Sequence, residues 1–238
     1  MKIALLGYGK MGKEIEKIAI SRGHEIVLKI NVDNARELTI DSLKKADAAI
    51  EFSTPETAYS NIQKCFEANV PVVVGTTGWL HKMEEVKNSA TRDGKGFFYA
   101  SNFSIGVNVF FEINKKLAQL MAPYKEYSIE MEEIHHTQKL DAPSGTAITL
   151  AEGIIDNNSR KNKWVNDKTS ADNELEIISK RIENIPGTHT VVYNSPIDEI
   201  YIRHKAHNRQ GFALGAVVAA EFMKGKSGYY GMNDLLKF

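Results

Sequence analysis

The sequence predicts an α/β fold in two parts: a parallel, doubly wound sheet, followed by an α+β region with a mainly antiparallel sheet. Three observations support this prediction. Strand-like and helix-like segments alternate up to residue 104, which is typical of a parallel sheet. A glycine-rich turn directly follows the first predicted strand. Beyond residue 104, the last three strand-like segments follow one another without a helix between them, which indicates an antiparallel arrangement.

Length and composition limit the possible functions of the chain. Its 238 residues are enough for one large domain or two small ones. Thirty basic residues balance thirty acidic ones, so no overall charge attracts nucleic acid or an anionic membrane. The single cysteine, Cys65, excludes an internal disulfide framework and fits a reducing compartment. No apolar run is long enough for a signal peptide or for the roughly 20 residues of a membrane span. We therefore expect a cytoplasmic protein with no nucleic-acid or membrane partner.

The elements of the first part are predicted from short apolar runs bounded by polar turns. A helix should run from the glycine-rich turn to about Ser21, because Ile15, Ile18 and Ala19 recur at helical spacing. A second helix should begin near Pro55, where Ser, Thr, Pro and Glu form a helix-start pattern. The predicted strands are Lys2–Leu6, Glu25–Asn31, Ala48–Phe52, Val70–Val74 and Gly96–Ala100.

The second part is expected to contain two helices and four strands. The polar stretch Asp156–Ser170 is expected to be a loop, and the apolar helix Phe212–Lys224 is expected to pack back on the first part. We therefore divide the chain into residues 1–104 with 210–238, and residues 105–209. The predicted elements of the second part are helices Val107–Leu120 and Ser144–Ile155, and strands Tyr127–His135, Leu175–Ile182, His189–Tyr193 and Glu199–His204.

The glycine-rich turn is the pattern Gly7-Tyr8-Gly9-Lys10-Met11-Gly12. Its context, after a strand and before a helix, indicates a Rossmann-type dinucleotide-binding domain. Gly7 permits the tight turn, Gly9 lets the backbone approach a pyrophosphate, and Gly12 allows close helix–strand packing. The alternative, a glycine-rich turn without a ligand, is less consistent with this context.

Two residues are candidates for the contact with the cofactor ribose. Dinucleotide-binding domains with this glycine pattern usually have an acidic residue about twenty residues beyond the turn. Asn31 and Asp33 both lie near that position, at the end of the second predicted strand. Lys10, and more distantly Arg36, would favour a ribose 2′-phosphate. Both NADH and NADPH therefore remain possible.

Three polar turns follow predicted strands and are expected to form a rim around the cofactor: Phe52-Ser53-Thr54-Pro55, Gly75-Thr76-Thr77-Gly78 and Ala100-Ser101-Asn102-Phe103. Ligands of open parallel sheets lie beyond the carboxyl ends of the strands. Each turn alone is also compatible with ordinary turn chemistry, but their repetition at successive strand ends favours a cofactor rim. The residues assigned to this rim are Gly75, Thr76, Thr77, Ala100, Ser101, Asn102 and Phe103.

The densest polar stretch of the chain is residues 130–147. Histidine is a common acid–base catalyst, so His135 and His136 are candidates for that role, and Lys139 offers a positive charge or a proton. The backbone N–H groups of Gly145 and Thr146, with the Ser144 and Thr146 hydroxyls, could hold a carboxylate at a helix start. Adjacent histidines on a strand point to opposite faces, so no metal site is expected. A solvated strand end with no function is the remaining alternative.

One segment closely resembles the signature of the bacterial dihydrodipicolinate reductase (4-hydroxy-tetrahydrodipicolinate reductase) family. It reads Glu133-x-His135-His136-x-x-Lys139-x-Asp141-x-Pro143-Ser144-Gly145-Thr146-Ala147. Other segments resemble the family in the same order, and together they span nearly the whole chain. They are residues 7–12, residues 75–78, Asn102-Phe103-Ser104-x-Gly106-Val107-Asn108, and Ile202-x-His204-Lys205-Ala206 with Arg209 and Phe212.

The resemblance implies a dinucleotide-binding domain made from both ends of the chain and a central substrate and tetramerisation domain. It implies that His135 is the acid/base group and Lys139 the proton donor. His136, Lys139, Gly145 and Thr146 would then hold the substrate. Asn31 stands where the family usually has Asp or Glu, so the resemblance leaves the choice between NADH and NADPH open.

The expected activity is NAD(P)H-dependent reduction of a cyclic dicarboxylate, (hydroxy-tetra)hydrodipicolinate, in lysine and diaminopimelate biosynthesis. Two alternatives are another two-domain nicotinamide dehydrogenase that acts on an amino acid or semialdehyde, and a non-catalytic NAD(P)-sensing protein. The first gives no reason for the His–His–Lys–Gly–Thr pattern, and the second predicts cofactor binding without turnover.

Overall fold

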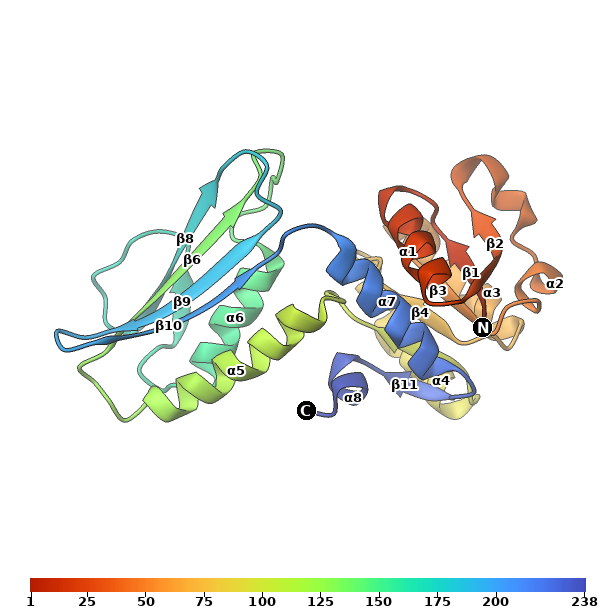
Figure 1. Ribbon diagram of the computed structural model, residues 1–238. Coiled ribbons are helices and arrows are strands. Elements are labelled where there is room, and N and C mark those ends of the chain that lie inside the picture. Colours follow the sequence, from red (N-terminus) through yellow and green to blue (C-terminus); the bar gives the residue numbers. More distant parts are fainter. The chain divides into compact units, whose positions relative to one another are not determined.

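The computed structural model describes residues 1–238. The chain divides into two compact units, Met1–Ile105 with Arg209–Phe238, and Gly106–Asn208 (Figure 1). None of the helices has both the length and the apolar character needed to cross a membrane.

The first unit is built on a six-stranded sheet in the order β11-β5-β4-β3-β1-β2. Every neighbouring pair is parallel, as the alternating pattern predicted. The sequence did not indicate β11, a three-residue strand that extends the sheet beside β5. The strands are β1 (Lys2–Leu6), β2 (Glu25–Ile30), β3 (Ala48–Glu51), β4 (Val72–Val74), β5 (Gly96–Tyr99) and β11 (Gly228–Tyr230).

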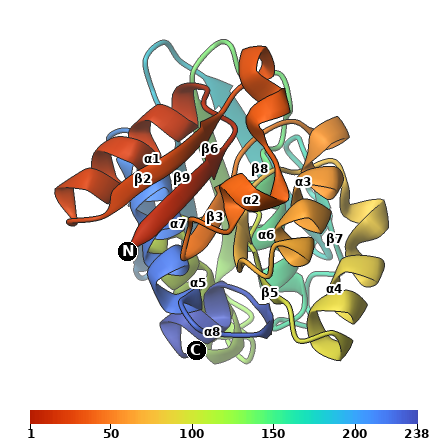
Figure 2. The same cartoon turned by 90° about the vertical axis from the view of Figure 1, so that its right-hand side faces the viewer.

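Helices cover both faces of this sheet (Figure 2). On one face lie α1 (Lys10–Ser21) and α7 (Gln210–Met223), and on the other lie α3 (Pro55–Glu67) and α4 (Met83–Arg92). Side chains of β1 alternate between the two cores, which explains why this strand is continuously apolar. The remaining short elements are η1 (Val32–Glu37), α2 (Ile40–Leu43), η2 (Leu80–Lys82) and α8 (Met232–Leu236).

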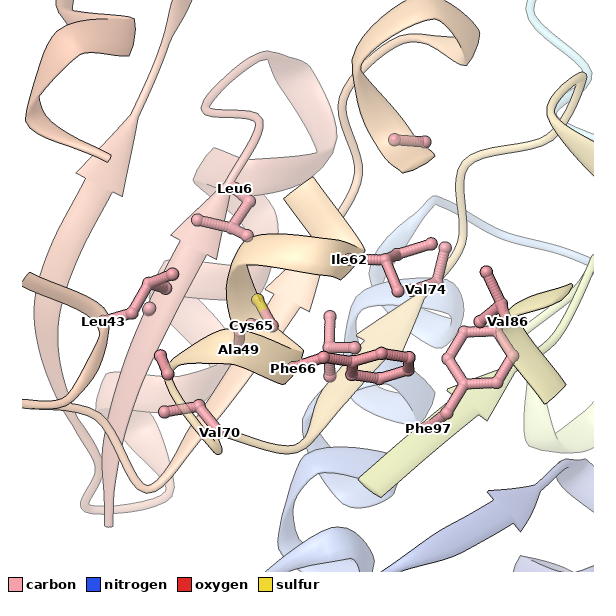
Figure 3. Close-up of a cluster of buried hydrophobic side chains, with 14 of the residues drawn as sticks. Leu6, Leu43, Ala49, Ile62, Cys65, Phe66, Val70, Val74, Val86 and Phe97 are labelled. Carbon is pink, nitrogen blue, oxygen red and sulfur yellow. The ribbon is translucent and has the colours of Figure 1, made fainter. Parts of the chain in front are cut away.

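Figure 3 shows the core between α3, α4 and the sheet. The rings of Phe66 on α3 and Phe97 on β5 meet edge to face, with centroids 6.3 Å apart. Cys65 is completely buried in this cluster, and burial raises the pKa of its thiol. This packing fixes the strand ends from which the loops of the first unit leave the sheet.

The second unit has a five-stranded sheet in the order β10-β9-β6-β8-β7. Helices α5 (Ile105–Met121) and α6 (Gly145–Ile155) pack on one face, against side chains such as Met131, Ile177 and Val191. The opposite face carries polar and partly exposed side chains, among them Glu132, Lys180 and Tyr201. The strands are β6 (Ser128–His135), β7 (Lys163–Val165), β8 (Glu174–Arg181), β9 (Thr188–Asn194) and β10 (Glu199–Lys205).

The prediction of a mainly antiparallel sheet was wrong, because this sheet is mixed. Strands β6, β9 and β10 pair antiparallel, but β6 pairs parallel with β8, and β8 pairs parallel with β7. The chain leaves β6 and passes through α6 before it returns to the sheet, and such a crossover joins parallel strands. The stretch Asp156–Ser170, expected to be a loop, contains β7, which is too short and polar to show a strand pattern.

Candidate active site

The glycine-rich turn follows β1 and leads directly into α1, as predicted. Gly7 has a φ of +101°, and a Cβ there would lie 2.1 Å from the carbonyl oxygen of Phe52. A Cβ on Gly12 would lie 2.3 Å from the Gly7 carbonyl oxygen, so this glycine lets the helix pack against the turn. Gly9 differs, since a Cβ there would meet nothing within 4 Å. Because Gly9 lines a cavity, that space is free for a ligand.

The cavity beside this turn has a volume of about 460 Å³. Four of the predicted cofactor residues line it: Gly7, Tyr8, Gly9 and Asn31. The N-terminus of α1 has no side-chain cap, so its free N–H groups can take a phosphate. The remaining lining residues, which include no Asp or Glu, are Ile30, Val32, Ala35, Leu38, Phe52, Ser53, Thr54, Thr57, Ser60, Asn61 and Lys64.

The two candidates for the ribose contact lie in different environments. Asn31 lines the cavity, but its side-chain oxygen accepts a hydrogen bond from the Val32 N–H at 2.8 Å and caps η1. Asp33 is exposed in the first turn of η1 and does not line the cavity. Asn31 is therefore the better placed of the two, through its amide nitrogen.

A second cavity in the same unit, of about 230 Å³, contains five more predicted residues: Met11, Gly75, Ser101, Asn102 and Phe103. Phe52, Arg209 and Phe212 complete its lining. The aromatic ring of Phe52 borders both cavities. A Cβ on Gly75 would lie 2.2 Å from that ring, which is why this position is a glycine.

Five other predicted cofactor residues line neither cavity. Lys10 and Thr77 are exposed, whereas Gly12 and Ala100 are buried. Thr76 is also buried, and its hydroxyl accepts a hydrogen bond from the Ser53 N–H at 2.9 Å. Thr76 therefore ties together the loops that follow β3 and β4.

A buried carboxyl group, which the sequence did not single out, supports the same two loops. Glu51 at the end of β3 is fully buried. One of its oxygens accepts hydrogen bonds from the Ser53 N–H at 3.2 Å, from the Ser53 hydroxyl, and from Asn61 Nδ2 at 3.3 Å. Burial raises the pKa of Glu51, and the hydrogen bonds from Ser53, Thr76 and Asn61 partly offset that effect. Only its position at a strand end hinted at this role.

The second unit holds the His–Lys segment, with His135 at the end of β6. His135 is buried, and its Nδ1 lies 2.9 Å from Oε2 of the fully buried Glu133. The alignment of this contact falls short of an ideal hydrogen bond. Both side chains point to the helix-covered face of the sheet, because residues two apart on a strand share a face.

Lys139 and the helix start follow in the loop after β6. The Lys139 ammonium pairs with both carboxylate oxygens of Asp141 at 2.9 Å, and this pairing lowers the pKa of Asp141. Ser144 is buried and caps α6, its hydroxyl accepting a hydrogen bond from the Ala147 N–H at 3.2 Å. Gly145 and Thr146 form the first turn of α6, and Gly145 is exposed. Lys139 and the α6 start thus belong to one continuous loop and helix.

His136, the remaining predicted residue, follows the end of β6 and is half-buried. Its carbonyl oxygen accepts a hydrogen bond from the Lys139 N–H at 3.1 Å, which closes a tight turn. This turn brings the histidine and the lysine of the signature into one short loop.

Two residues that the sequence analysis missed complete this cluster. Arg181 at the end of β8 pairs with Glu133, with Nη2 and Oε1 3.1 Å apart. His189 on β9 lies directly opposite Glu133 in the sheet, and its Nε2 lies 3.2 Å from the Ser144 hydroxyl. Burial, followed by the charge of His135, lowers the pKa of His189 to about 3, so it is neutral near pH 7. A signal was present, because His189 shares its strand face with the buried Val191.

The expectation of no metal rested on the neighbouring pair His135 and His136. The structure brings together a different set, since ligand atoms of Glu133, His135 and His189 all lie within 4.8 Å of one another. A cation there would share its carboxylate with the guanidinium of Arg181, and this like charge disfavours binding. The absence of a metal stays a prediction.

Comparison with known proteins decides the family. A family model described as "Dihydrodipicolinate reductase, N-terminus" matches residues 1–103, and its C-terminal counterpart matches residues 106–236. The chain belongs to the dihydrodipicolinate reductase family. The 4-hydroxy-tetrahydrodipicolinate reductase of Christiangramia forsetii is 52% identical over 99% of this chain and 98% of its own length. The same-named enzyme of Thermosipho africanus is 33% identical over 100% of this chain and 98% of its own length.

Solved structures agree with this family assignment. Dipicolinate-bound dihydrodipicolinate reductase from a Paenisporosarcina species superposes with a TM-score of 0.77 at 25% identity, and the match covers 97% of each chain. An amine dehydrogenase from Mycobacterium smegmatis shares only the fold, with a TM-score of 0.62 at 9% identity over 97% of this chain and 94% of its own. As a member of the dihydrodipicolinate reductase family, the chain is an NAD(P)H-dependent oxidoreductase, and its N-terminal part belongs to the dinucleotide-binding domain.

Proposed function

We propose that this chain reduces 4-hydroxy-tetrahydrodipicolinate to tetrahydrodipicolinate with NADH or NADPH, in lysine and diaminopimelate biosynthesis. The observation that carries the proposal is the cluster of His135, Lys139 and Ser144 in a chain 52% identical to an enzyme of that name. Residues 1–104 with 210–238 would bind the dinucleotide, and residues 105–209 would bind the substrate.

The substrate has two carboxylates, and the second unit offers two kinds of group to hold them. The first turn of α6 presents the N–H groups of Gly145 and Thr146, at a helix N-terminus that favours negative charge. Lys139 and His136 would hold the other carboxylate. Lys139 is now paired with Asp141, whose side chain is exposed, so a substrate carboxylate can replace Asp141 at little expense.

Proton transfer completes the proposed reaction. The 4-hydroxyl group of the substrate would leave as water to give a conjugated imine, and the nicotinamide, when bound, would supply a hydride to that imine. Reduction of the conjugated system leaves an electron-rich enamine carbon that must gain a proton. The Lys139 ammonium or the His135 imidazolium would give up this proton. The buried carboxylate of Glu133 lies 2.9 Å from Nδ1 of His135 and so fixes the orientation of the imidazole ring. The opposite nitrogen, Nε2, is then the one that can reach a reacting atom.

The lining of the larger cavity supports use of NADPH as well as NADH. An acidic side chain at this place would bind the ribose hydroxyls and repel a 2′-phosphate. Asn31 is neutral, and Lys64 adds a positive charge to the lining. Calorimetric titration with both cofactors tests this proposal, and Lys64→Met should weaken NADPH binding while it leaves NADH binding within about twofold. Equal losses for both cofactors would contradict it.

Reductase turnover, followed by cofactor absorbance, tests the proposed activity. Wild-type protein should oxidise NADH or NADPH only when the hydroxylated or dehydrated dihydrodipicolinate substrate is present. Lys139→Ala and His135→Ala should each lower kcat by about 100-fold or more, as loss of a general acid does. Cofactor binding without turnover would instead indicate a sensor, and turnover with amino acids would indicate the other dehydrogenase class.

We also propose a cytoplasmic homotetramer. The helix-free face of the five-stranded sheet carries the half-exposed Tyr201 beside the partly buried Val192, with the partly buried Ile178 further along the same face on β8. A second copy could cover this face and exclude water from these apolar side chains. Light scattering should give a mass of about four times 26.6 kDa, and Tyr201→Glu should lower it. A monomeric wild-type mass would overturn the proposal.

A further inference from the structure

Two buried charges of the second unit, Glu133 and Arg181, have no direct part in the proposed chemistry. Glu133 is fully buried, and four-fifths of the Arg181 side chain is shielded from water, with 21% exposed. We propose that this ion pair is the positioning element of the substrate site, which holds His135 and the Lys139 loop in their working geometry. This inference rests on the roles proposed above for His135 and Lys139.

Arg181 joins three parts of the site with one rigid group. Its Nη1 and Nη2 donate to Oε1 of Glu133 at 3.2 and 3.1 Å. Its Nε donates to the Lys139 carbonyl oxygen at 3.2 Å, and Nη2 also donates to the Asp141 carbonyl oxygen at 2.6 Å. The loop that carries the proposed proton donor is thus fixed to the β6 carboxylate through a planar fork. A lysine ammonium cannot reproduce this fork, because it is a single point charge.

The second oxygen of Glu133 connects the remaining parts. Oε2 lies 2.9 Å from Nδ1 of His135 and 3.9 Å from Nε2 of His189. His189 in turn contacts the Ser144 hydroxyl that caps α6. One carboxylate therefore links the strand end with the acid/base histidine, the lysine loop and the helix start. Burial by itself would raise the pKa of Glu133, but the nearby polar groups of His135, Ser144 and Ser179 outweigh burial and keep the pKa low.

The same two strands offer a matched control on the opposite sheet face. Glu132 and Lys180, each one residue before a member of the proposed pair, form their own ion pair there. Their side chains are 34% and 51% exposed, so this pair is a surface ion pair of small energetic value. A change there alters charge and strand sequence in the same way without touching the site, and light scattering of each control variant shows whether assembly through that face is kept.

The experiment compares Arg181→Met, Arg181→Lys and Glu133→Gln with Lys180→Met and Glu132→Gln in the full-length protein. Arg181→Met and Glu133→Gln should lower kcat by about 30-fold, because small misplacements of reacting groups lower rates strongly. Arg181→Lys should recover only part of that loss, and added guanidinium ion should raise kcat of Arg181→Met. Both control variants should stay within about twofold of wild type.

Binding measurements separate positioning from general damage. Dipicolinate, the ligand of the related solved enzyme, should bind Arg181→Met no more than about fivefold more weakly, because the Ser144 cap of α6 remains. NADH and NADPH affinities should be unchanged, since every residue that lines the two cavities lies in the first unit. A loss of kcat with little loss of dipicolinate affinity would support a positioning role.

Wild-type kcat in both Arg181→Lys and Glu133→Gln would overturn the inference, as would equal losses in the control variants. If Arg181→Met does not fold, these two milder variants decide the matter. Failure of the proposed function is distinguishable, because wild-type protein would then show no reductase turnover at all.

Discussion

The three glycines of the turn differ in what a methyl group would meet, and this difference yields a sharp prediction. In Gly9→Ala the new Cβ would have no protein atom within 4 Å. The backbone conformation at Gly9, with a φ of −82°, is one that any residue can adopt. Folding should therefore change by less than about 1 kcal/mol. The methyl group would occupy the cavity next to the free N–H groups of α1, where a pyrophosphate is expected.

Displacing a phosphate from one such N–H group forfeits a hydrogen bond to a charged partner, worth about 1.5–3 kcal/mol. Gly9→Ala should therefore weaken NADH or NADPH binding by roughly 10- to 150-fold. Gly12→Ala provides the contrast, because its Cβ would lie 2.3 Å from a backbone oxygen. This variant should lose about 1–3 kcal/mol of stability through overpacking.

Cofactor titration by fluorescence and unfolding in urea measure the two effects separately. If Gly9→Ala binds both cofactors within about twofold of wild type while it folds normally, the pyrophosphate does not lie on this turn. If it loses stability as Gly12→Ala does, the space around Gly9 is not as open as the structure indicates.

Three further predictions concern buried polar groups. Burial lowers the pKa of His189, so below about pH 6.5 the unfolded chain binds a proton that the folded chain does not. The free energy of unfolding should therefore fall by about 2 kcal/mol between about pH 7.5 and 5, and urea unfolding of His189→Gln should not show this decrease. Burial raises the pKa of Glu51, so ionisation of this carboxyl should destabilise the wild type as the pH rises above about 4.5. Glu51→Gln should therefore become more stable relative to wild type over that range, and a constant difference in the free energy of unfolding would show that Glu51 is not held neutral. Ser144→Ala removes the side-chain cap of α6 and should lower the free energy of unfolding by about 1 kcal/mol. It should also weaken dipicolinate binding, and an unchanged dipicolinate affinity in calorimetric titration would contradict a role of this helix start in carboxylate binding.

The parallel sheet of the first unit could be predicted because its signals are local. Each buried strand is a short apolar run, and Gly7 and Pro55 mark the helix starts within a few residues. Strand β11 could not be found this way, since three residues contain no usable period and only pairing with β5 defines them. The mixed sheet of the second unit was missed for a related reason, because strand direction depends on how the chain returns after α6.

The candidate site was predictable as far as it lies within one segment. His135, Lys139 and Ser144 are close in sequence, so their types and spacing were visible together. Arg181 and His189 reach Glu133 only through pairing of β6 with β8 and β9, which no local pattern specifies. Glu51 stood at a predicted strand end, but its hydrogen bonds to the Ser53 loop require the folded arrangement.

The division of the chain also sets an order of assembly on the ribosome. Residues 106–208 form one contiguous unit, whereas the sheet and one core of the first unit need α7 and β11 from the far end of the chain. A nascent chain that has reached residue 208 thus contains all residues of the second unit, while the part of the N-terminal sheet face that α7 covers is still exposed. The cofactor-binding half is the first to be translated and the last to be finished, so it is the half exposed longest to chaperones, proteases and misassociation during synthesis.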